Sequence, residues 1–142
     1  MVDLRRAAPP LLLLLALALT GLARAIELPP YVYKEWQQKA PESLIIKVRS
    51  VKTSEEDEPR RKKISVTVLA QVQKVERSKA GLKPGQMITI TYVHSRYQQP
   101  LAGPSEVPIL EEGKVYPAFL KKAEGEDSYS PAAGGRSFEV VK

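Results

Sequence analysis

His94 is the only histidine in the chain and the first residue to consider for chemistry. It precedes Ser95 and lies near Ser105 in the sequence, so it could act as the general base for a serine nucleophile. A catalytic triad is defined by geometry, however, and adjacency in sequence does not indicate one. We therefore expect His94 to be a surface residue where a strand meets a loop. A small hydrolase that uses His94 remains an alternative function.

The carboxylates are poorly spaced for metal binding or for glycoside hydrolysis. Residues 55–58 are consecutive acids that lack the alternation and the glycine of an EF-hand loop. Glu111 and Glu112 are neighbours, so they would point to opposite faces of a strand or lie in a turn, and they do not form a catalytic pair. The chain contains no cysteine, which removes thiolate ligands and thiol nucleophiles. We predict no catalytic residue, no metal site and no cofactor.

The elements that must position any site are predicted to be strands. Alternating apolar residues indicate strands over residues 43–53, 63–77, 87–93, 114–122 and 137–141. The alternation slips by one at Val51 and again near residues 73–74, as β-bulges would cause. The strand over residues 63–77 is too long to stay straight in a small domain, so we expect it to curl and serve both halves of a barrel.

The connections between these strands differ in character. Residues 54–63 are four acids, a proline and four bases after a serine, which predicts a solvated hairpin tip whose charges largely cancel. Residues 78–85 contain Gly81 and Gly85, expected to supply positive φ at a reversal. The long proline-containing loop over residues 94–108 is the best place to look for a site.

Together these segments predict an all-β fold, a five-stranded OB-like Greek-key barrel over residues 43–142, with a β-sandwich as the alternative. An N-terminal arm over residues 26–42 precedes the barrel. Its aromatic residues are Tyr31, Tyr33 and Trp36, and Tyr33 and Trp36 can face the same way. Prolines limit a helix here to two turns over residues 33–39. We expect the arm to plug one end of the core.

Residues 1–25 have the three parts of a signal peptide. Arg5 and Arg6 give a positive start, residues 11–22 give an apolar core, and Ala23-Arg24-Ala25 gives a small-x-small cleavage site. The apolar run is short for a membrane-spanning helix, which needs roughly 20 apolar residues. The sequence therefore predicts a secreted or extracytoplasmic protein that starts at Ile26 and has no stable membrane insertion after cleavage.

The order of motifs resembles a known family. VLAQVQKVERSKAGLKPGQMITITY is followed by a Pro/Gly loop, then LEEGKVYPAFLKK and a final SFEVV. This order is similar to that of secreted OB-folds of the netrin-module and tissue-inhibitor-of-metalloproteinases group, over residues 43–141. The resemblance implies an OB-fold and, as an alternative function, a protease-inhibitor-like domain. Those inhibitors place an N-terminal cysteine on the protease zinc, and this chain has no cysteine, so the fold can carry over without the inhibition.

The function that remains is an exported, non-catalytic binding module. Its partner is expected to be a protein or glycan in the extracytoplasmic space, and not a nucleic acid, although the net charge of the whole chain is +6. The concave barrel face and the adjoining loops would hold the partner. The candidate binding residues are Tyr92, His94, Arg96, Tyr97, Tyr116 and Tyr129.

Overall fold

The computed structural model describes residues 28–99, 105–124 and 127–142, and these residues are mostly β, as predicted. Their elements are α2 (Pro30–Lys39), β1 (Glu42–Asp57), β2 (Arg61–Ser78), β3 (Met87–Tyr97), β4 (Val115–Lys122), β5 (Tyr129–Pro131) and the short 3-10 helix η2 (Gly134–Arg136). The predicted signal peptide lies outside the described residues.

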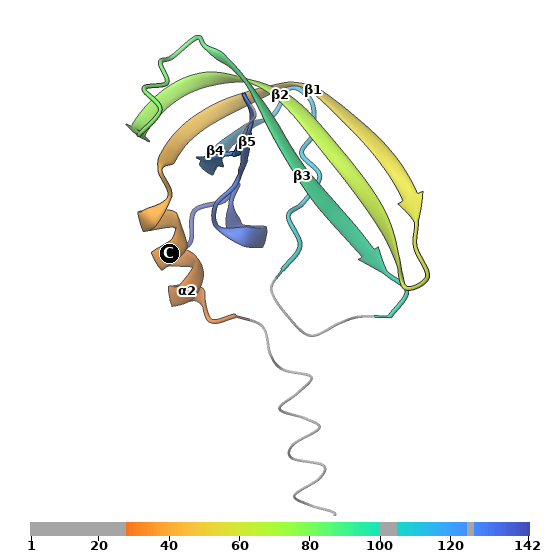
Figure 1. The fold of residues 1–142 in the computed structure, drawn as a ribbon. Coiled ribbons are helices and arrows are strands. Elements are labelled where there is room, and N and C mark those ends of the chain that lie inside the picture. The colour runs from red at the N-terminus through yellow and green to blue at the C-terminus, as the bar shows by residue number, and fades with distance from the viewer. Residues whose placement is uncertain (1–27, 100–104, 125–126) are drawn as a thin grey trace, which may run out of the picture.

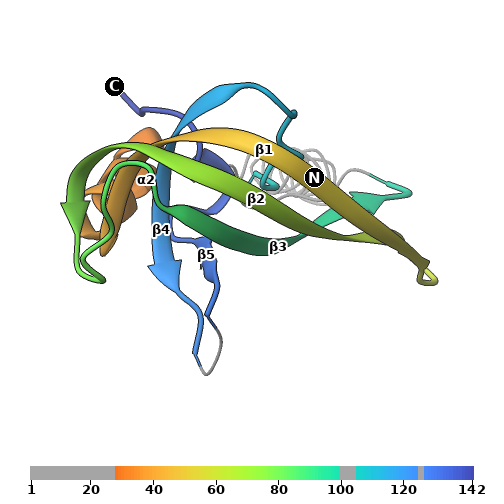
Figure 2. The same ribbon diagram turned by 90° about the horizontal axis from the view of Figure 1, so that it is seen from above.

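The strands form one sheet that closes on itself in the order β1-β2-β3-β5-β4. The ring closes because β1 pairs with β2 along nearly its whole length and also with β4 through residues 42–47. All pairs are antiparallel except β3 with β5. Figures 1 and 2 show the three long strands curving side by side, with β4 and β5 crossing them. A single sheet excludes the sandwich that the sequence left as an alternative.

Bulges between β1 and β2 allow these long strands to bend. The register shifts between Val48 and Ser50, at the predicted first bulge, and between Ile45 and Ile46, where Gln73 on β2 is left without a partner. A third shift, between Ser43 and Leu44, was not predicted. Each extra residue increases the local twist of the strand, so β1 can pair with β2 and with β4.

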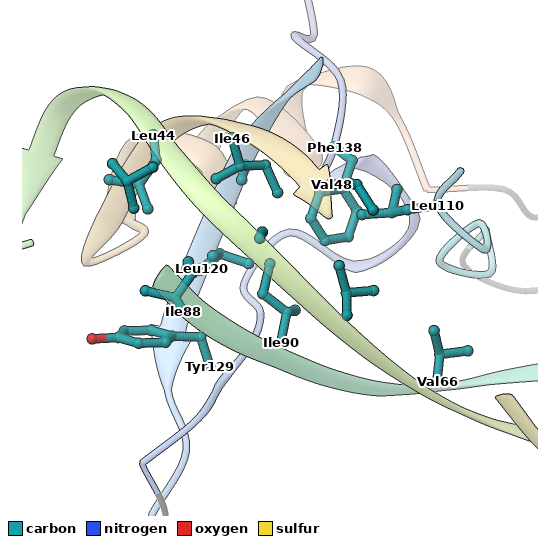
Figure 3. Packing of buried hydrophobic residues seen from close by; sticks show 14 of the residues in the cluster. Leu44, Ile46, Val48, Val66, Ile88, Ile90, Leu110, Leu120, Tyr129 and Phe138 are labelled. Carbon is teal, nitrogen blue, oxygen red and sulfur yellow. The ribbon is translucent and has the colours of Figure 1, made fainter. Parts of the chain in front are cut away.

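The core lies inside this ring and follows the predicted alternation. Every second residue is buried over residues 44–48 of β1, 64–72 of β2 and 88–90 of β3, and side chains from these strands and β4 meet at the centre (Figure 3). The buried core comprises Leu44, Ile46, Val48, Ile64, Val66, Val68, Ala70, Val72, Leu82, Ile88, Ile90, Leu110, Ala118, Leu120, Tyr129 and Phe138. Each fully buried aliphatic side chain contributes roughly 1.5–3 kcal/mol, so this cluster can replace disulfides as the source of stability.

The strands extend beyond their predicted ends into the charged segment. β1 continues to Asp57 and β2 begins at Arg61, so only residues 58–60 form the turn. β3 likewise continues past residue 93 to Tyr97, because it stays paired with β2 as far as Arg61. The predicted hairpin tip is confirmed, but it is much tighter than a ten-residue charged loop. The reason is that acids on β1 face bases on β2 across the ladder.

The predicted closing strand over residues 137–141 is wrong. The fifth strand is β5, and η2 and an irregular segment follow it. The hydroxyl of Ser137 donates to the carbonyl of Gly134 and accepts from the amide of Ala133, so local bonds replace a strand ladder here. Phe138 is nevertheless buried and supplies the apolar side chain expected of that strand.

The N-terminal arm is more helical than predicted. α2 begins at Pro30, because proline fits the first helical position, where its missing N–H is not needed. Tyr33 and Trp36 do lie together, with ring centroids 5.6 Å apart in an edge-to-face arrangement. Arg77 donates to the carbonyls of Gln37 and Ala40 at the end of α2, so β2 holds the helix in place. Figure 1 shows α2 beside the C-terminal segment.

The connection between β2 and β3 has the predicted conformation. Gly81 and Gly85 have φ values of 76° and 90°, a region that other residues rarely adopt. Glu42, only 1% exposed, fixes this connection: its carboxylate accepts from the Ser78 hydroxyl and from the Ala80 amide at 2.9 Å. These hydrogen bonds satisfy a polar group that is buried away from water.

Candidate functional site

Two of the six candidate residues, Tyr92 and His94, anchor the segment that follows β3. The Tyr92 hydroxyl donates to the Pro108 carbonyl at 2.8 Å and accepts from the Leu110 amide at 3.3 Å. His94 Nδ1 lies 2.7 Å from the Val107 carbonyl, so this nitrogen carries the hydrogen. Both side chains therefore hold residues 107–110 against the barrel.

A hydrolytic role for His94 would need a serine hydroxyl bound to its ring. The Nδ1–H donates to a backbone carbonyl, which fixes the orientation of the ring and leaves Nε2 as the nitrogen without a hydrogen. The neighbouring Ser95 is buried, and its hydroxyl accepts from Arg61 Nη1 at 2.8 Å. A serine nucleophile needs a hydrogen bond to the base, and among the described contacts Ser95 is bound to a cation instead.

Tyr116 and Tyr129 also serve the fold. The Tyr116 hydroxyl accepts from the Glu111 amide at 3.1 Å, and its ring packs edge-to-face on Phe138, 6.4 Å away between centroids. Tyr129 is 6% exposed, and burial is the main cause that raises the pKa of its phenol. These two tyrosines expose little surface that a partner could contact.

Arg96 and Tyr97 are different, because both are exposed at the outer end of β3. Figures 1 and 2 place this end, together with the β1–β2 turn, on the opposite side of the molecule from α2. Arg96 lies opposite Lys62, and Tyr97 lies opposite Arg61. Antiparallel pairing thus brings residues from the charged turn next to the two candidate residues that remain accessible.

Two adjoining hollows open at this end. One is about 260 Å³ and is lined by Asp57, Glu58, Arg61, Lys62, Arg96, Tyr97 and Gln98. The other is about 410 Å³, and its lining includes Arg60, Tyr97, Gln98 and Gln99. Tyr97, which is 39% exposed, and Gln98 line both. We call these two hollows and their lining residues the outer site.

The acids of the outer site form ion pairs with two of its bases, Arg61 and Lys62. Arg61 Nε lies 2.7 Å from Glu58 Oε2. Lys62 Nζ lies 3.4 Å from Glu55 and 4.0 Å from Asp57. The hydrogen bond from Arg61 is the main cause that lowers the pKa of Glu58, and the same bond raises the pKa of the Arg61 guanidinium.

Arg60 and Arg96 are left over from this pairing. Within the described residues, neither guanidinium forms an ion pair with a carboxylate, and both side chains are exposed. The charges of this tip were expected to largely cancel, and residues 55–63 do contain four acids and four bases. Pairing is specific, and it leaves two arginines that can meet an anion.

Sequence reasoning named Arg96 and Tyr97 but missed Arg60, Arg61, Gln98 and Gln99 as their neighbours. The assumption that β3 ends at Val93 put these glutamines in a long loop, far from the charged tip. The backbone amide of Gln98 donates to the Arg60 carbonyl at 3.2 Å, which joins the two segments. The only available signal was the polar alternation after Val93, which can continue a strand beyond the core.

A third hollow lies between α2 and the C-terminal segment. It is about 320 Å³ and is lined by Leu28, Pro30, Tyr33, Arg136, Glu139, Val140, Val141 and Lys142. The Arg136 guanidinium lies 5.8 Å from the centroid of the Tyr33 ring, and Arg136 also pairs with Glu139 at 2.7 Å. Two of its charged residues, Arg136 and Glu139, are thus bound to each other.

Within residues 28–99, 105–124 and 127–142, no cluster of three or more His, Asp or Glu side chains could hold a metal ion. In the same residues, no helix is long and apolar enough to cross a membrane. No protein-family model, curated protein or solved structure matches the chain significantly.

Proposed function

We propose that the chain is an exported, non-catalytic binding module of OB-like fold, whose partner in the extracytoplasmic space is a protein or a glycan. Export is inferred from the leader in residues 1–25. The OB-like assignment is supported by the strand order β1-β2-β3-β5-β4, by the parallel contact of β3 with β5, and by a bulged β1 that pairs with both β2 and β4.

The observation that carries the binding role is the outer site. It combines a concave surface, a partly exposed aromatic ring and two exposed arginines without carboxylate partners among the described residues. Tyrosine and arginine are the residue types enriched where proteins bind partners, because they offer large contact areas and several hydrogen bonds at once.

The hydrolase alternative rests on His94 with a nearby serine, and the hydroxyl of the adjacent Ser95 is bound to Arg61 instead. The protease-inhibitor alternative rests on the family resemblance in the sequence and has no cysteine to contact a metal. Neither alternative gains support from a described contact, so the binding role is the function that the geometry favours.

The test compares retention of partners by the mature chain and by a variant of the outer site. The mature chain, residues 26–142, is immobilised and exposed to a glycan array and to an extracytoplasmic protein fraction. We expect at least one ligand to be retained by the wild type and lost by the double variant Arg96→Ser with Tyr97→Ser. His94→Ala should retain the same ligand after its folding is checked by circular dichroism.

Two results would contradict the proposal. One is retention of every ligand by the outer-site double variant, which would put binding elsewhere. The other is turnover of a hydrolase substrate by the wild type that His94→Ala abolishes while the fold is preserved.

A further inference from the structure

The three strands of the outer site place charged residues directly opposite each other, and one of these pairs has like charges. Asp57 on β1 faces Lys62 on β2, and Lys62 faces Arg96 on β3. Two cations at opposed positions in a sheet repel each other. The acids of β1 offset the charge of Lys62, as the ion pairs with Glu55 and Asp57 show, and Arg96 is left at the open end of the row. An anion beside Arg96 would relieve this repulsion.

A second arginine, Arg60 in the turn between β1 and β2, lines the same hollow as Tyr97. Arg60 lines one hollow and Arg96 lines the other, and Tyr97 belongs to both. The bond between the Gln98 amide and the Arg60 carbonyl holds the turn close to the end of β3. Guanidinium groups bind carboxylates through two parallel N–H···O bonds, which a lysine cannot imitate. The outer site is therefore suited to a ligand that bears planar carboxylates.

The uncharged side chains of the outer site indicate what else the ligand carries. Gln98 and Gln99 are exposed next to Tyr97. An amide side chain both donates and accepts hydrogen bonds, as a sugar hydroxyl does, and an aromatic ring packs on the apolar C–H face of a pyranose. The two hollows, about 260 and 410 Å³, fall in the size range of small-ligand sites when taken together.

An acidic peptide fits the outer site less well than a sugar. Peptides that bind barrels in extended form add a strand to an open sheet edge. On the β3 edge next to the outer site, the Ser95 amide is already bound, because it donates to Glu106 Oε2 at 3.3 Å. A sugar acid does not need this edge, because it can be held by side chains alone.

We propose that the outer site binds acidic carbohydrate, specifically oligosaccharides of uronic acids whose carboxylates pair with Arg60 and Arg96 while a sugar ring packs on Tyr97. This inference rests on the proposed binding function and names its ligand class. Uronic acids occur in polysaccharides of extracytoplasmic surfaces, in the compartment that the leader predicts.

The test is isothermal titration calorimetry on the mature chain at low salt. The probes are a short oligogalacturonate, the same oligomer with its carboxyls reduced to alcohols, a short oligoglutamate and inorganic phosphate. We expect the oligogalacturonate to bind, and the reduced oligomer to bind at least about tenfold more weakly because it lacks the carboxylates. Oligoglutamate and phosphate should also bind more weakly than the oligogalacturonate.

Variants then assign the contacts. Arg60→Gln and Arg96→Gln should each weaken oligogalacturonate binding by about tenfold, because each removes one bidentate pair. Tyr97→Leu should weaken both the acidic and the reduced oligomer. The matched control is Lys83→Gln, which removes one exposed positive charge from the turn between β2 and β3 at the other end of the molecule. It should leave binding unchanged.

The outcomes separate this inference from the proposed function. Equal binding of the reduced oligomer, or tighter binding of oligoglutamate or phosphate, would overturn the acidic-sugar assignment while the outer site remains a binding site. Loss of oligogalacturonate binding in Lys83→Gln to the same degree as in Arg96→Gln would show attraction by overall charge and would also overturn it. Absence of any binding by the probes would overturn it too, and the array experiment then decides the proposed function independently.

Discussion

The hydroxyl of Tyr92 joins strand β3 to a segment sixteen residues later by donating to the Pro108 carbonyl at 2.8 Å. The same oxygen accepts from the Leu110 amide at 3.3 Å. Leu110 is buried in the core cluster, and Val107 and Ile109 pack against that cluster. One phenol thus holds an irregular segment, which has no strand ladder of its own, against the core cluster.

Replacing Tyr92 with phenylalanine should remove both bonds and keep the ring. We expect Tyr92→Phe to lower the free energy of unfolding by about 1–2 kcal/mol, because a buried amide and a carbonyl lose their partner. Chemical denaturation measures this change. Hydrogen exchange should show faster exchange at the Leu110 amide in the variant. The control is Tyr31→Phe on exposed α2, which should change neither quantity, and an equal loss in both variants would contradict the assignment.

Because the pKa of Tyr92 is raised, we expect the free energy of unfolding to fall at high pH. Burial is the main cause that raises this pKa to about 12, and Tyr116 adds to the rise while the bond from Leu110 opposes it. An unfolded tyrosine titrates near pH 10, so the folded chain holds this proton more tightly between about pH 10 and 12. The stability that Tyr92 contributes is present below pH 10 and is lost as the pH rises through this window.

Ultraviolet absorbance of tyrosinate measures the effect. In the wild type one tyrosine should ionise last, and this late step should be missing in Tyr92→Phe. The unfolding midpoint should also fall more steeply with pH in the wild type than in the variant. Ionisation of all tyrosines near pH 10 in the folded wild type would rule this out.

Gln37 should be the residue of α2 most sensitive to substitution. Its Nε2 donates to the carbonyls of Arg136 and Glu139, each at 2.7 Å, and its Oε1 accepts from the Val141 amide at 3.3 Å. Gln37→Met preserves the length of the side chain but loses all three bonds, so we expect a loss of about 2–3 kcal/mol in denaturation experiments. The control is Gln38→Met, on the exposed face of the same helix, which should change the free energy of unfolding little. Similar losses for both would show that α2 does not depend on this link.

A methyl group at Gly135 has no room. A Cβ there would lie 2.4 Å from the Ser105 carbonyl oxygen and 2.6 Å from Ser105 Cβ. Because the backbone must move to make room, we expect Gly135→Ala to lower the free energy of unfolding by about 3 kcal/mol or more. Gly113→Ala is the matched control: it has open space around it but a φ of 82°, so it should cost only about 1–2 kcal/mol. Trp36 fluorescence should change in the first variant alone, since Trp36 packs beside Gly134.

The leader is expected to be removed after Ala25. In a host with a general secretion pathway, mass spectrometry of the exported chain should find Ile26 at its start. Replacing Ala23 and Ala25 together with leucine should block cleavage, because both small positions are read. Arg24→Leu changes only the middle position and should be processed normally. Retention of the whole chain in the cytoplasm would contradict the proposed address.

Strand positions in the core could be predicted because each strand has one buried face. Apolar residues at every second position identify that face in the sequence. Leu44, Ile46 and Val48 are an example, and the Arg49 bulge after them was visible as a slip in the same pattern. The closing segment was mispredicted for the converse reason: a short apolar run such as residues 137–141 has no period to read, and local hydroxyl bonds at Ser137 decide its shape.

The sequence by itself determined the cysteine-independent core, because burial and polarity alternate along each strand, and it named Arg96 and Tyr97 as candidate binding residues while placing them in a loop. The candidate site was decided only by tertiary structure. Which acids neutralise which bases depends on register across three strands, and register joins Arg60 to Gln98 although they are far apart in the chain. Charge can be counted along a sequence, but pairing between charges is a property of distances in space.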